Sequence, residues 1–374
     1  MGVELAQVIR ETIARGGPLT LAAFMDLALY HPAHGYYASA AQRSGRAGDF
    51  YTSVDAGPLF GELLAVQIAE MHASLGRVGL TGPFDLVEAG AGNGRLMRDV
   101  LDALAREHPA TYAAVRVTLV EASASARDAQ RQTLAAHPDR LAACLDDLPD
   151  AVTGVIVANE LLDAMPAHAV VARGGELREI YIDARDEQLV EVEGPLSTPE
   201  LADHFTRVGT ALPEGHRAEV SLQALAWVRH AAAKLSAGFL LLLDYGRQAD
   251  ELYSGAHANG TLMTYARHTA GRFDWLAAPG EADLTTHVDL TALQRTAEAS
   301  GLVPLGLVDQ TYFLLALGLA ERLETGHDRA SMGRRLAART LMMPGGLGST
   351  IKVAVFGRCV GTPALQGLAS GRLT

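Results

Sequence analysis

A short apolar run, a glycine-rich loop and a helix follow one another near residue 90, and this unit constrains the fold more than any other. The run covers residues 84–88, the loop holds Gly90, Gly92 and Gly94, and the helical pattern covers residues 95–106. Glycines let the backbone turn tightly and let a ligand approach the N–H groups at a helix N-terminus. The unit therefore predicts a ligand-binding turn in an α/β sheet, with a bare tight turn as the alternative.

The spacing of the loop discriminates between ligands. A dinucleotide fingerprint needs glycine or alanine three positions after its second glycine, and this chain has the bulky Arg95 there. The observed spacing, Gly90-x-Gly92-x-Gly94, follows the acidic Glu88. We therefore expect an adenosyl ligand without phosphates, whose amino-acid end lies at the loop and whose ammonium needs a carboxylate.

Polar residues also follow the later apolar runs. Glu121 closes the second run, where a carboxylate can accept both ribose hydroxyls, although a solvated strand end is the alternative. Asp146 and Asp147 could meet the adenine edge or act as ordinary turn acids. Asn159 and Glu160 end a further run, and strand ends at the centre of such a sheet face the ligand crevice. These residues extend the predicted binding site.

The apolar runs alternate with helical patterns, which predicts the fold class. Continuous runs at 84–88, 115–120, 154–158 and 238–243 indicate parallel strands covered on both faces. Residues 169–192 instead alternate with polar turns such as Gly174-Gly175 and favour an inserted antiparallel hairpin. We expect an α/β, doubly wound, mostly parallel sheet.

The same patterns suggest a domain division. Residues 1–80 are expected to form a helical N-terminal lobe that carries a lid loop over the cofactor. Residues 81–168 and 236–374 are expected to form the doubly wound domain, and 169–235 an inserted hairpin and helix region for the substrate.

The net charge of the chain and the length of its apolar runs limit the kinds of partner that it can bind. Lys and Arg number 31 against 43 Asp and Glu, so the net charge is −12. A duplex-binding surface needs a basic face, so we expect no nucleic acid, and a basic protein substrate fits better. No run approaches the ~18 apolar residues of a membrane span. Glu4 and Glu11 lie in a helical N-terminal pattern unlike a targeting peptide, which favours the cytoplasm.

Cysteine and histidine usage argues against a metal centre. Cys144 and Cys359 form no CxxC pair, and we interpret them as buried thiols in a reducing compartment. His31 and His34 are separated by Pro32, which breaks helical geometry, and no acids or cysteines stand beside them. We expect no bound metal.

Motifs spread in order over nearly the whole chain resemble the MidA-like family of S-adenosylmethionine-dependent methyltransferases, whose mitochondrial members serve complex I assembly as protein arginine methyltransferases. Besides the glycine loop, the matching pieces include Tyr30-His31-Pro32, Gly48-Asp49-Phe50 with Thr52-Ser53, Asn159-Glu160-x-x-Asp163-Ala164-x-Pro166, Asp244-Tyr245-Gly246, Gly260-Thr261-Leu262 with His268, and Pro279-Gly280-Glu281-Ala282-Asp283-Leu284-Thr285-x-His287.

The chain departs from the family pattern at three places. The family usually has Leu-Gly-Pro-Gly-Arg-Gly at residues 89–94, where this chain reads Ala-Gly-Ala-Gly-Asn-Gly. It usually has two phenylalanines at Leu161-Leu162 and a Pro-Glu at Val54-Asp55. Because the glycines are retained, the resemblance still implies a class I, Rossmann-like methyltransferase that binds S-adenosyl-L-methionine.

The resemblance implies arginine on a protein as the substrate, and a respiratory-complex subunit as one such protein. A guanidinium presents planar forks of donors and must be held bidentately beside the methyl group. Glu160 and Asp163 are the candidates for this clamp, although Asp163 could cap a helix instead. His287 is the candidate base because an ordinary histidine pKa lies near neutrality, and Asp283 is the fourth catalytic candidate. A structural role for His287 and a helix-capping role for Asp283 stay open.

The remaining expectations concern the lid, the assembly and the function class. In the loop at 48–53, Thr52 and Ser53 are expected to bind the carboxylate of the cofactor, with a simple surface loop as the alternative. The apolar run at 312–320 fits a core helix or the interface of a homodimer. The predicted function is methyl transfer. A cofactor-binding assembly protein without turnover and a nucleotide-dependent oxidoreductase are the alternatives.

Overall fold

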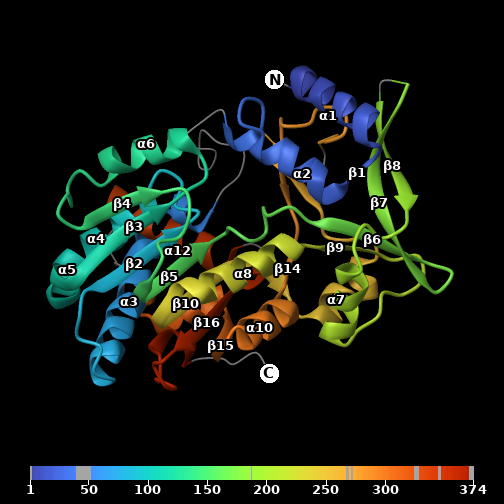
Figure 1. The fold of residues 1–374 in the computed structure, drawn as a ribbon. Coiled ribbons are helices and arrows are strands. Elements are labelled where there is room, and N and C mark those ends of the chain that lie inside the picture. Colours follow the sequence, from blue (N-terminus) through green and yellow to red (C-terminus); the bar gives the residue numbers. More distant parts are fainter. Residues whose placement is uncertain are drawn as a thin grey trace. The chain divides into compact units, whose positions relative to one another are not determined.

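A computed structural model describes residues 2–38, 52–186, 188–266, 269–270, 273–323, 328–343 and 347–369. The chain folds into two compact units (Figure 1). The first comprises residues 1–50, 162–228 and 245–296, and the second comprises 51–161, 229–244 and 297–374. The domain division expected from the sequence, with boundaries near 80, 168 and 235, stays a prediction.

The second unit is built on a mostly parallel sheet. Its strands lie in the order β15-β16-β10-β5-β2-β3-β4, and β4, β3, β2, β5 and β10 pair in parallel. The order reverses at β2, from which β3 and β4 lie on one side and β5 and β10 on the other. This confirms the expected doubly wound α/β class. The strands are β2 (Phe84–Ala89), β3 (Val115–Val120), β4 (Leu141–Leu145), β5 (Val152–Asn159), β10 (Leu235–Arg247), β15 (Val303–Asp309) and β16 (Ile351–Arg358).

Amphipathic helices accompany this sheet. In α4 (Arg95–Glu107), Leu96, Val100 and Leu104 recur four residues apart and are all buried. Helices α4 and α6 run beside β2, β3 and β4 in Figure 1. The other elements of the unit are η2 (Ser53–Ala56), α3 (Leu59–Arg77), α5 (Pro109–Ala114), α6 (Ala124–Thr133), α11 (Gln310–Ala316), α12 (Arg329–Met342), α13 (Leu347–Thr350) and η4 (Gln366–Leu368). Helix α8 (Leu222–Lys234) joins the two units.

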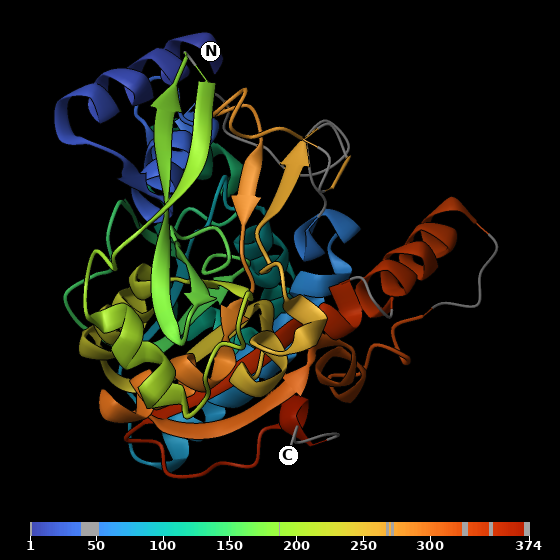
Figure 2. The same ribbon diagram turned by 90° about the vertical axis from the view of Figure 1, so that its right-hand side faces the viewer.

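The first unit contains the expected antiparallel hairpin. Strand β6 (His168–Arg173) pairs with β7 (Glu176–Arg185) around a turn in which Gly174 and Gly175 have φ values of +61° and +84°. Strand β8 (Gln188–Gly194) pairs with the far side of β7, and Figure 2 shows these green strands side by side. The sheet is completed by β9 (Arg217–Val220) on β6 and by β1 (Leu19–Thr20) on β7.

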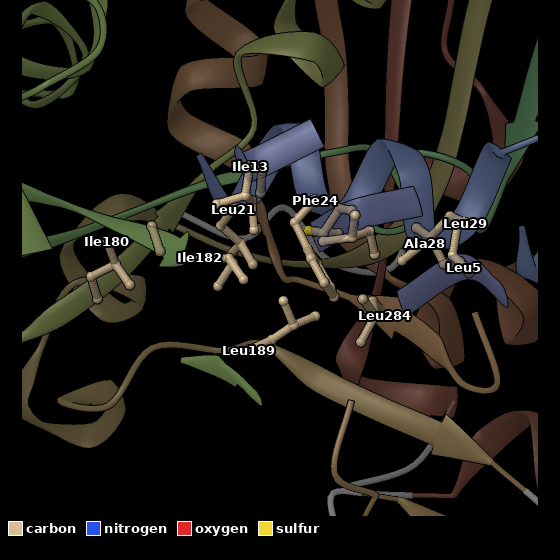
Figure 3. Packing of buried hydrophobic residues seen from close by; sticks show 14 of the residues in the cluster. Leu5, Ile13, Leu21, Phe24, Ala28, Leu29, Ile180, Ile182, Leu189 and Leu284 are labelled. Carbon is tan, nitrogen blue, oxygen red and sulfur yellow. The ribbon is translucent and has the colours of Figure 1, made fainter. Parts of the chain in front are cut away.

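Two N-terminal helices cover this sheet and form the core of the first unit. Helix α1 (Gly2–Gly16) contributes Ile13, and α2 (Leu21–Tyr30) contributes Leu21 and Phe24. Figure 3 shows these side chains facing Ile182 and Leu189 of the sheet. The unit also holds η1 (Tyr36–Ala38), α7 (Glu200–Val208), α9 (Ala249–Leu252), η3 (Gly255–His257), β11 (Met263–Ala266), β12 (Thr269–Ala270), β13 (Asp283–Thr285), β14 (Val288–Asp289) and most of α10 (Leu290–Ala299).

Close backbone approach at the centre of the large sheet requires glycine. Gly154 of β5 has φ +154°, and a Cβ there would lie 1.9 Å from the carbonyl oxygen of Asp85 on β2. We expect Gly154→Ala to lower the free energy of unfolding by about 3 kcal/mol, because a backbone clash in a central strand cannot relax cheaply. Urea unfolding followed by circular dichroism measures the change.

The matched control is Gly76→Ala in α3, where the added Cβ meets nothing within 4 Å. This variant should unfold at the wild-type urea concentration or slightly above it. Equal midpoints for both variants would show that β5 can separate from β2 at no cost.

Candidate cofactor and catalytic site

The glycine loop has the left-handed backbone that its sequence requires. Gly90, Gly92 and Gly94 have φ values of +70°, +50° and +84°, which side chains with a Cβ rarely adopt. The turn is closed by the Ala91 N–H on the Val120 carbonyl (3.0 Å) and by the Gly94 N–H on the Ala91 carbonyl (2.9 Å). Gly94 is the N-cap of α4. The loop thus ends directly at a helix N-terminus.

Two side chains from outside the loop hold its middle. Glu121, which follows β3, accepts the Gly92 N–H at Oε2 (2.8 Å) and the Ser123 N–H at Oε1 (2.9 Å). Gln130 of α6 donates from Nε2 to the Gly92 carbonyl (2.8 Å). The structure therefore brings Glu121 to the loop, whereas its expected contact with the ribose hydroxyls stays a prediction. Gln130 was not predicted, because nothing in its helical sequence distinguishes it from a surface glutamine.

Glu88 lies under the loop at the end of β2. It is 4% exposed, and its Oε2 has no hydrogen-bond partner among the described residues. Burial, assisted by the nearby Glu121 carboxylate, raises the pKa of Glu88 to about 8 against the opposing hydrogen bond from the Met97 N–H. Glu88 is therefore mostly protonated at pH 7, and a cation placed beside it would stabilise the ionised carboxylate.

The two acids after β4 differ in their surroundings. The end of β4 lies beside Glu121, because the Glu121 N–H donates to the Leu145 carbonyl (2.9 Å). Asp146 comes next and is exposed. Asp147 is also exposed, and its Oδ1 already accepts from His230 Nε2 (2.9 Å) and the Leu148 N–H (2.7 Å). Asp146 thus stays the better candidate for an adenine contact.

Glu160 follows β5 in a strained conformation. Its φ is +50°, unusual for a residue with a Cβ, and its N–H donates to the Leu243 carbonyl of β10 (2.8 Å). The carboxylate accepts at Oε1 from the Ser53 N–H (3.0 Å) and from Asn159 Nδ2 (3.3 Å). Burial and the Asp244 carboxylate raise the pKa of Glu160 to about 7, although the Ser53 N–H opposes the shift.

The two described residues of the expected lid are engaged within the protein. The Thr52 N–H and hydroxyl both donate to Asp55 Oδ2, at 3.0 and 2.9 Å. Ser53 is fully buried, with its N–H on Glu160 and its hydroxyl on Gln310 Oε1 (3.1 Å). Their expected contact with the carboxylate of the cofactor stays a prediction. The rest of the lid motif, residues 48–51, and the matched His268 lie outside the described residues.

Three of the four catalytic candidates lie in the first unit. Asp283 accepts the Tyr37 hydroxyl at Oδ1 (2.9 Å), and the Asp163 carbonyl accepts the Thr286 N–H (2.8 Å). Burial, together with the negative charges of Asp283 and Asp163, raises the pKa of Tyr37 well above its ordinary value. Tyr37 is therefore a neighbour of both Asp163 and Asp283. Asp283 lies in β13 and caps no helix there.

His287 differs from the sequence-based expectation. Burial, together with Arg247 and His257, lowers the pKa of its imidazole to about 4. Its Nδ1 is buried without a partner among the described residues. The near-neutral pKa for which we selected His287 is therefore wrong, and the ring is neutral at pH 7.

The histidine pair near the N-terminus has a local role. His31 Nδ1 accepts the Ala33 N–H (3.3 Å) and the His34 N–H (3.2 Å), and the two rings stack at 5.2 Å. Among the described residues, no three His, Cys, Asp or Glu side chains form a group that could hold a metal ion.

The second unit offers acceptors that an adenosyl amino acid can satisfy. Glu88 Oε2, Gln130 Oε1 and Asn159 Oδ1 are buried without partners among the described residues. S-adenosylmethionine carries matching donors in its ammonium, ribose hydroxyls and adenine amino group. The side chain of Arg95 is engaged by Asp55 (2.6 Å) and presents no free phosphate site. The fold and this donor–acceptor balance define a doubly wound α/β protein that binds an adenosyl cofactor.

Comparisons with known proteins agree with this class. A family model described as an S-adenosyl-L-methionine-dependent methyltransferase matches residues 63–308. A crystal structure of a COG1565 superfamily member from Burkholderia thailandensis, bound to S-adenosylhomocysteine, superposes with a TM-score of 0.90 at 31% identity, covering 100% of this chain and 96% of that one.

Curated relatives match over most of their length. The Caenorhabditis elegans protein arginine methyltransferase NDUFAF7 homolog, mitochondrial, is 30% identical over 348 residues, which cover 85% of this chain and 77% of that protein. Human protein arginine methyltransferase NDUFAF7, mitochondrial, is 29% identical over 349 residues, covering 84% and 73%. The chain belongs to the S-adenosyl-L-methionine-dependent methyltransferases. The predicted cofactor and enzyme class are confirmed, and the oxidoreductase and scaffold alternatives are not favoured.

Among the helices of the described residues, none is both long enough and apolar enough to cross a membrane.

The raised pKa of Glu88 predicts that ligand binding releases protons. If the ammonium of S-adenosylhomocysteine pairs with Glu88, it stabilises the carboxylate, lowers the pKa and displaces the proton that Glu88 holds at pH 7. We expect binding to release about one proton. Calorimetry in two buffers with different ionisation enthalpies measures this number.

The matched variants are Glu88→Gln, which should abolish the release, and Glu160→Gln, which should retain it. Proton release that survives in Glu88→Gln would place the ammonium elsewhere.

Proposed function

We propose that this enzyme methylates arginine on a protein substrate and that Glu160 holds the guanidinium. The observation that carries the proposal is a half-buried carboxylate at the end of the central strand β5, held by the Ser53 N–H and, among the described residues, without a cation as a hydrogen-bond partner. The printed names of the relatives, protein arginine methyltransferases, support the choice of arginine.

The geometry at Glu160 suits a cationic substrate. A carboxylate with a pKa of about 7 is only partly ionised in the free protein at neutral pH. A guanidinium beside it favours the ionised form, and the pair forms charge-assisted hydrogen bonds with a fixed direction. Since Ser53 and Asn159 bind Oε1, Oε2 is the oxygen that would receive the substrate. Such a contact would orient one guanidinium nitrogen.

The proton balance also assigns a role to Glu160. The bound cofactor supplies an electrophilic methyl group, so a carbon–nitrogen bond forms as the carbon–sulfur bond breaks. The attacking nitrogen must then lose one proton. Glu160, with a pKa of about 7, accepts it more readily than His287, whose pKa is about 4. We therefore assign proton acceptance to Glu160. Roles for Asp163, Asp283 and His287 stay predictions.

The location and assembly belong to the same proposal. We propose a cytoplasmic protein, supported by Cys144 and Cys359, which are both free thiols. The expectation that both are buried is wrong, because Cys144 is half-buried and Cys359 is exposed. A homodimer is supported by α11, on which Tyr312 and Leu315 are 48% and 40% exposed while Phe313 is buried. A respiratory-complex subunit as substrate stays a prediction from the family resemblance.

Replacement of Glu160 tests the proposed function. Glu160→Gln keeps the size of the side chain but removes its charge and its proton-accepting oxygen. We expect methyl transfer to fall about a hundredfold, while affinity for S-adenosylhomocysteine stays within twofold. The wild-type rate should rise with pH through about 7, because the ionised carboxylate is the active form. Labelled-methyl incorporation into protein of a lysate that lacks the endogenous enzyme, followed by methylarginine analysis, measures both effects.

The control variant is Asp150→Asn, which removes a fully exposed carboxylate paired with Lys234 and should transfer methyl at the wild-type rate. Equal incorporation by Glu160→Gln and wild type would remove Glu160 from the mechanism. Label in an amino acid other than arginine would exclude the proposed substrate.

A further inference from the structure

Arg95 is the residue whose role neither the cofactor nor the proposed reaction explains. It is the first residue of α4, directly after the glycine loop. Its Nη2 lies 2.6 Å from Asp55 Oδ1, and the Asp55 side chain is only 2% exposed. Because a buried carboxylate without a cation is costly, the ion pair holds Asp55 in place.

Asp55 in turn fixes the backbone of the neighbouring segment. Its second oxygen, Oδ2, accepts both the Thr52 N–H (3.0 Å) and the Thr52 hydroxyl (2.9 Å). The Asp55 carboxylate thus binds the Arg95 guanidinium with one oxygen and two Thr52 donors with the other. These contacts restrict the conformation of the backbone at the start of η2. The position of the next residue, Ser53, is therefore restricted.

Ser53 carries this restriction to Glu160. Its N–H donates to Glu160 Oε1 (3.0 Å), and its hydroxyl donates to Gln310 Oε1 (3.1 Å). Gln310 is fully buried and donates from Nε2 to the carbonyls of Leu341 (3.3 Å) and Leu347 (3.2 Å). Ser53 is thus held from two sides, by Asp55 through Thr52 and by Gln310.

We propose that Arg95 is a positioning residue for Glu160, which acts through Asp55 and the Thr52–Ser53 backbone to fix the N–H that binds the carboxylate. The inference rests on the proposed function, in which Glu160 holds the substrate. It adds that the first turn of α4, which bounds the cofactor loop, also sets the orientation of the Glu160 carboxylate that holds the substrate. We name the chain of contacts from Arg95 to Glu160 the Arg95 strap.

The Ser53 amide provides a direct readout of the strap. We would label the full chain with ¹⁵N-serine, assign the Ser53 signal by its loss in Ser53→Ala, and titrate the ligand-free protein between about pH 5.5 and 9. The amide shift should follow the ionisation of Glu160, with a midpoint near 7 that disappears in Glu160→Gln. Arg95→Gln should raise this midpoint by about one pH unit, because a loosened N–H stabilises the carboxylate less. Arg95→Lys keeps the charge and should restore most of the wild-type value.

A second variant separates positioning from a simple field effect. Removing the negative charge of Asp55 would by itself lower the pKa of Glu160, because that charge raises it. Asp55→Ala also breaks the Arg95 strap. If the strap positions the Ser53 N–H, the midpoint of the Ser53 titration should rise, whereas a field effect alone should lower it. The control is Arg98→Gln, which breaks the Arg98–Asp99 pair (2.7 Å) on the same helix and should leave the Ser53 titration unchanged.

The outcomes distinguish this inference from the proposed function. An unchanged midpoint in Arg95→Gln, a lowered midpoint in Asp55→Ala, or a Ser53 signal that ignores Glu160→Gln would overturn the strap. None of these measurements involves substrate or methyl transfer. If the strap variants behave as expected while Glu160→Gln still transfers methyl at the wild-type rate, the proposed function fails and the strap stands.

Discussion

The parallel pairing of β2 with β5 is the contact on which the rest of the site depends. Its register sets Glu88 opposite Val157 and Ala89 opposite Ala158, so the two strands end at the same edge. Gly154 makes the pairing feasible because any Cβ there would strike the β2 backbone. The strand order reverses at this point, and the carboxyl ends of strands at such a reversal form the usual ligand crevice of an open α/β sheet.

Two carboxylates with raised pKa values lie at that edge, the buried Glu88 and the half-buried Glu160. Glu88 and Glu160 both have raised pKa values, and burial is the largest cause for each. Removing a carboxylate from water without a cation beside it costs free energy, so a bound cation would stabilise either residue in its ionised form. The cofactor and an arginine substrate are both cations at the atoms concerned, and each would stabilise the ionised form of one of these acids. In the proposed function, the same physical property therefore prepares both binding positions.

Much of the cofactor region could be predicted, while its supporting contacts could not. The glycine loop and Glu121 follow from local patterns at strand ends, and the structure brings them together. The Gln130 contact and the Arg95–Asp55 pair have no sequence signal, because a glutamine in a helix or an aspartate in a turn is common anywhere. From the sequence, Arg95 is distinguished only as an obstacle to a dinucleotide. Its partner, 40 residues earlier, became visible only in the folded chain.

The sequence by itself determined the class of protein, because strand–loop–helix patterns and glycine positions are dictated by local steric limits that hold in any fold. Tertiary structure alone decided the state of the titratable groups. His287 has an unremarkable sequence context, yet its pKa falls to about 4 because packing removes water and places Arg247 and His257 nearby. Glu160 likewise meets the Ser53 N–H across 107 positions. Burial and long-range contacts arise from packing, so no local pattern encodes them.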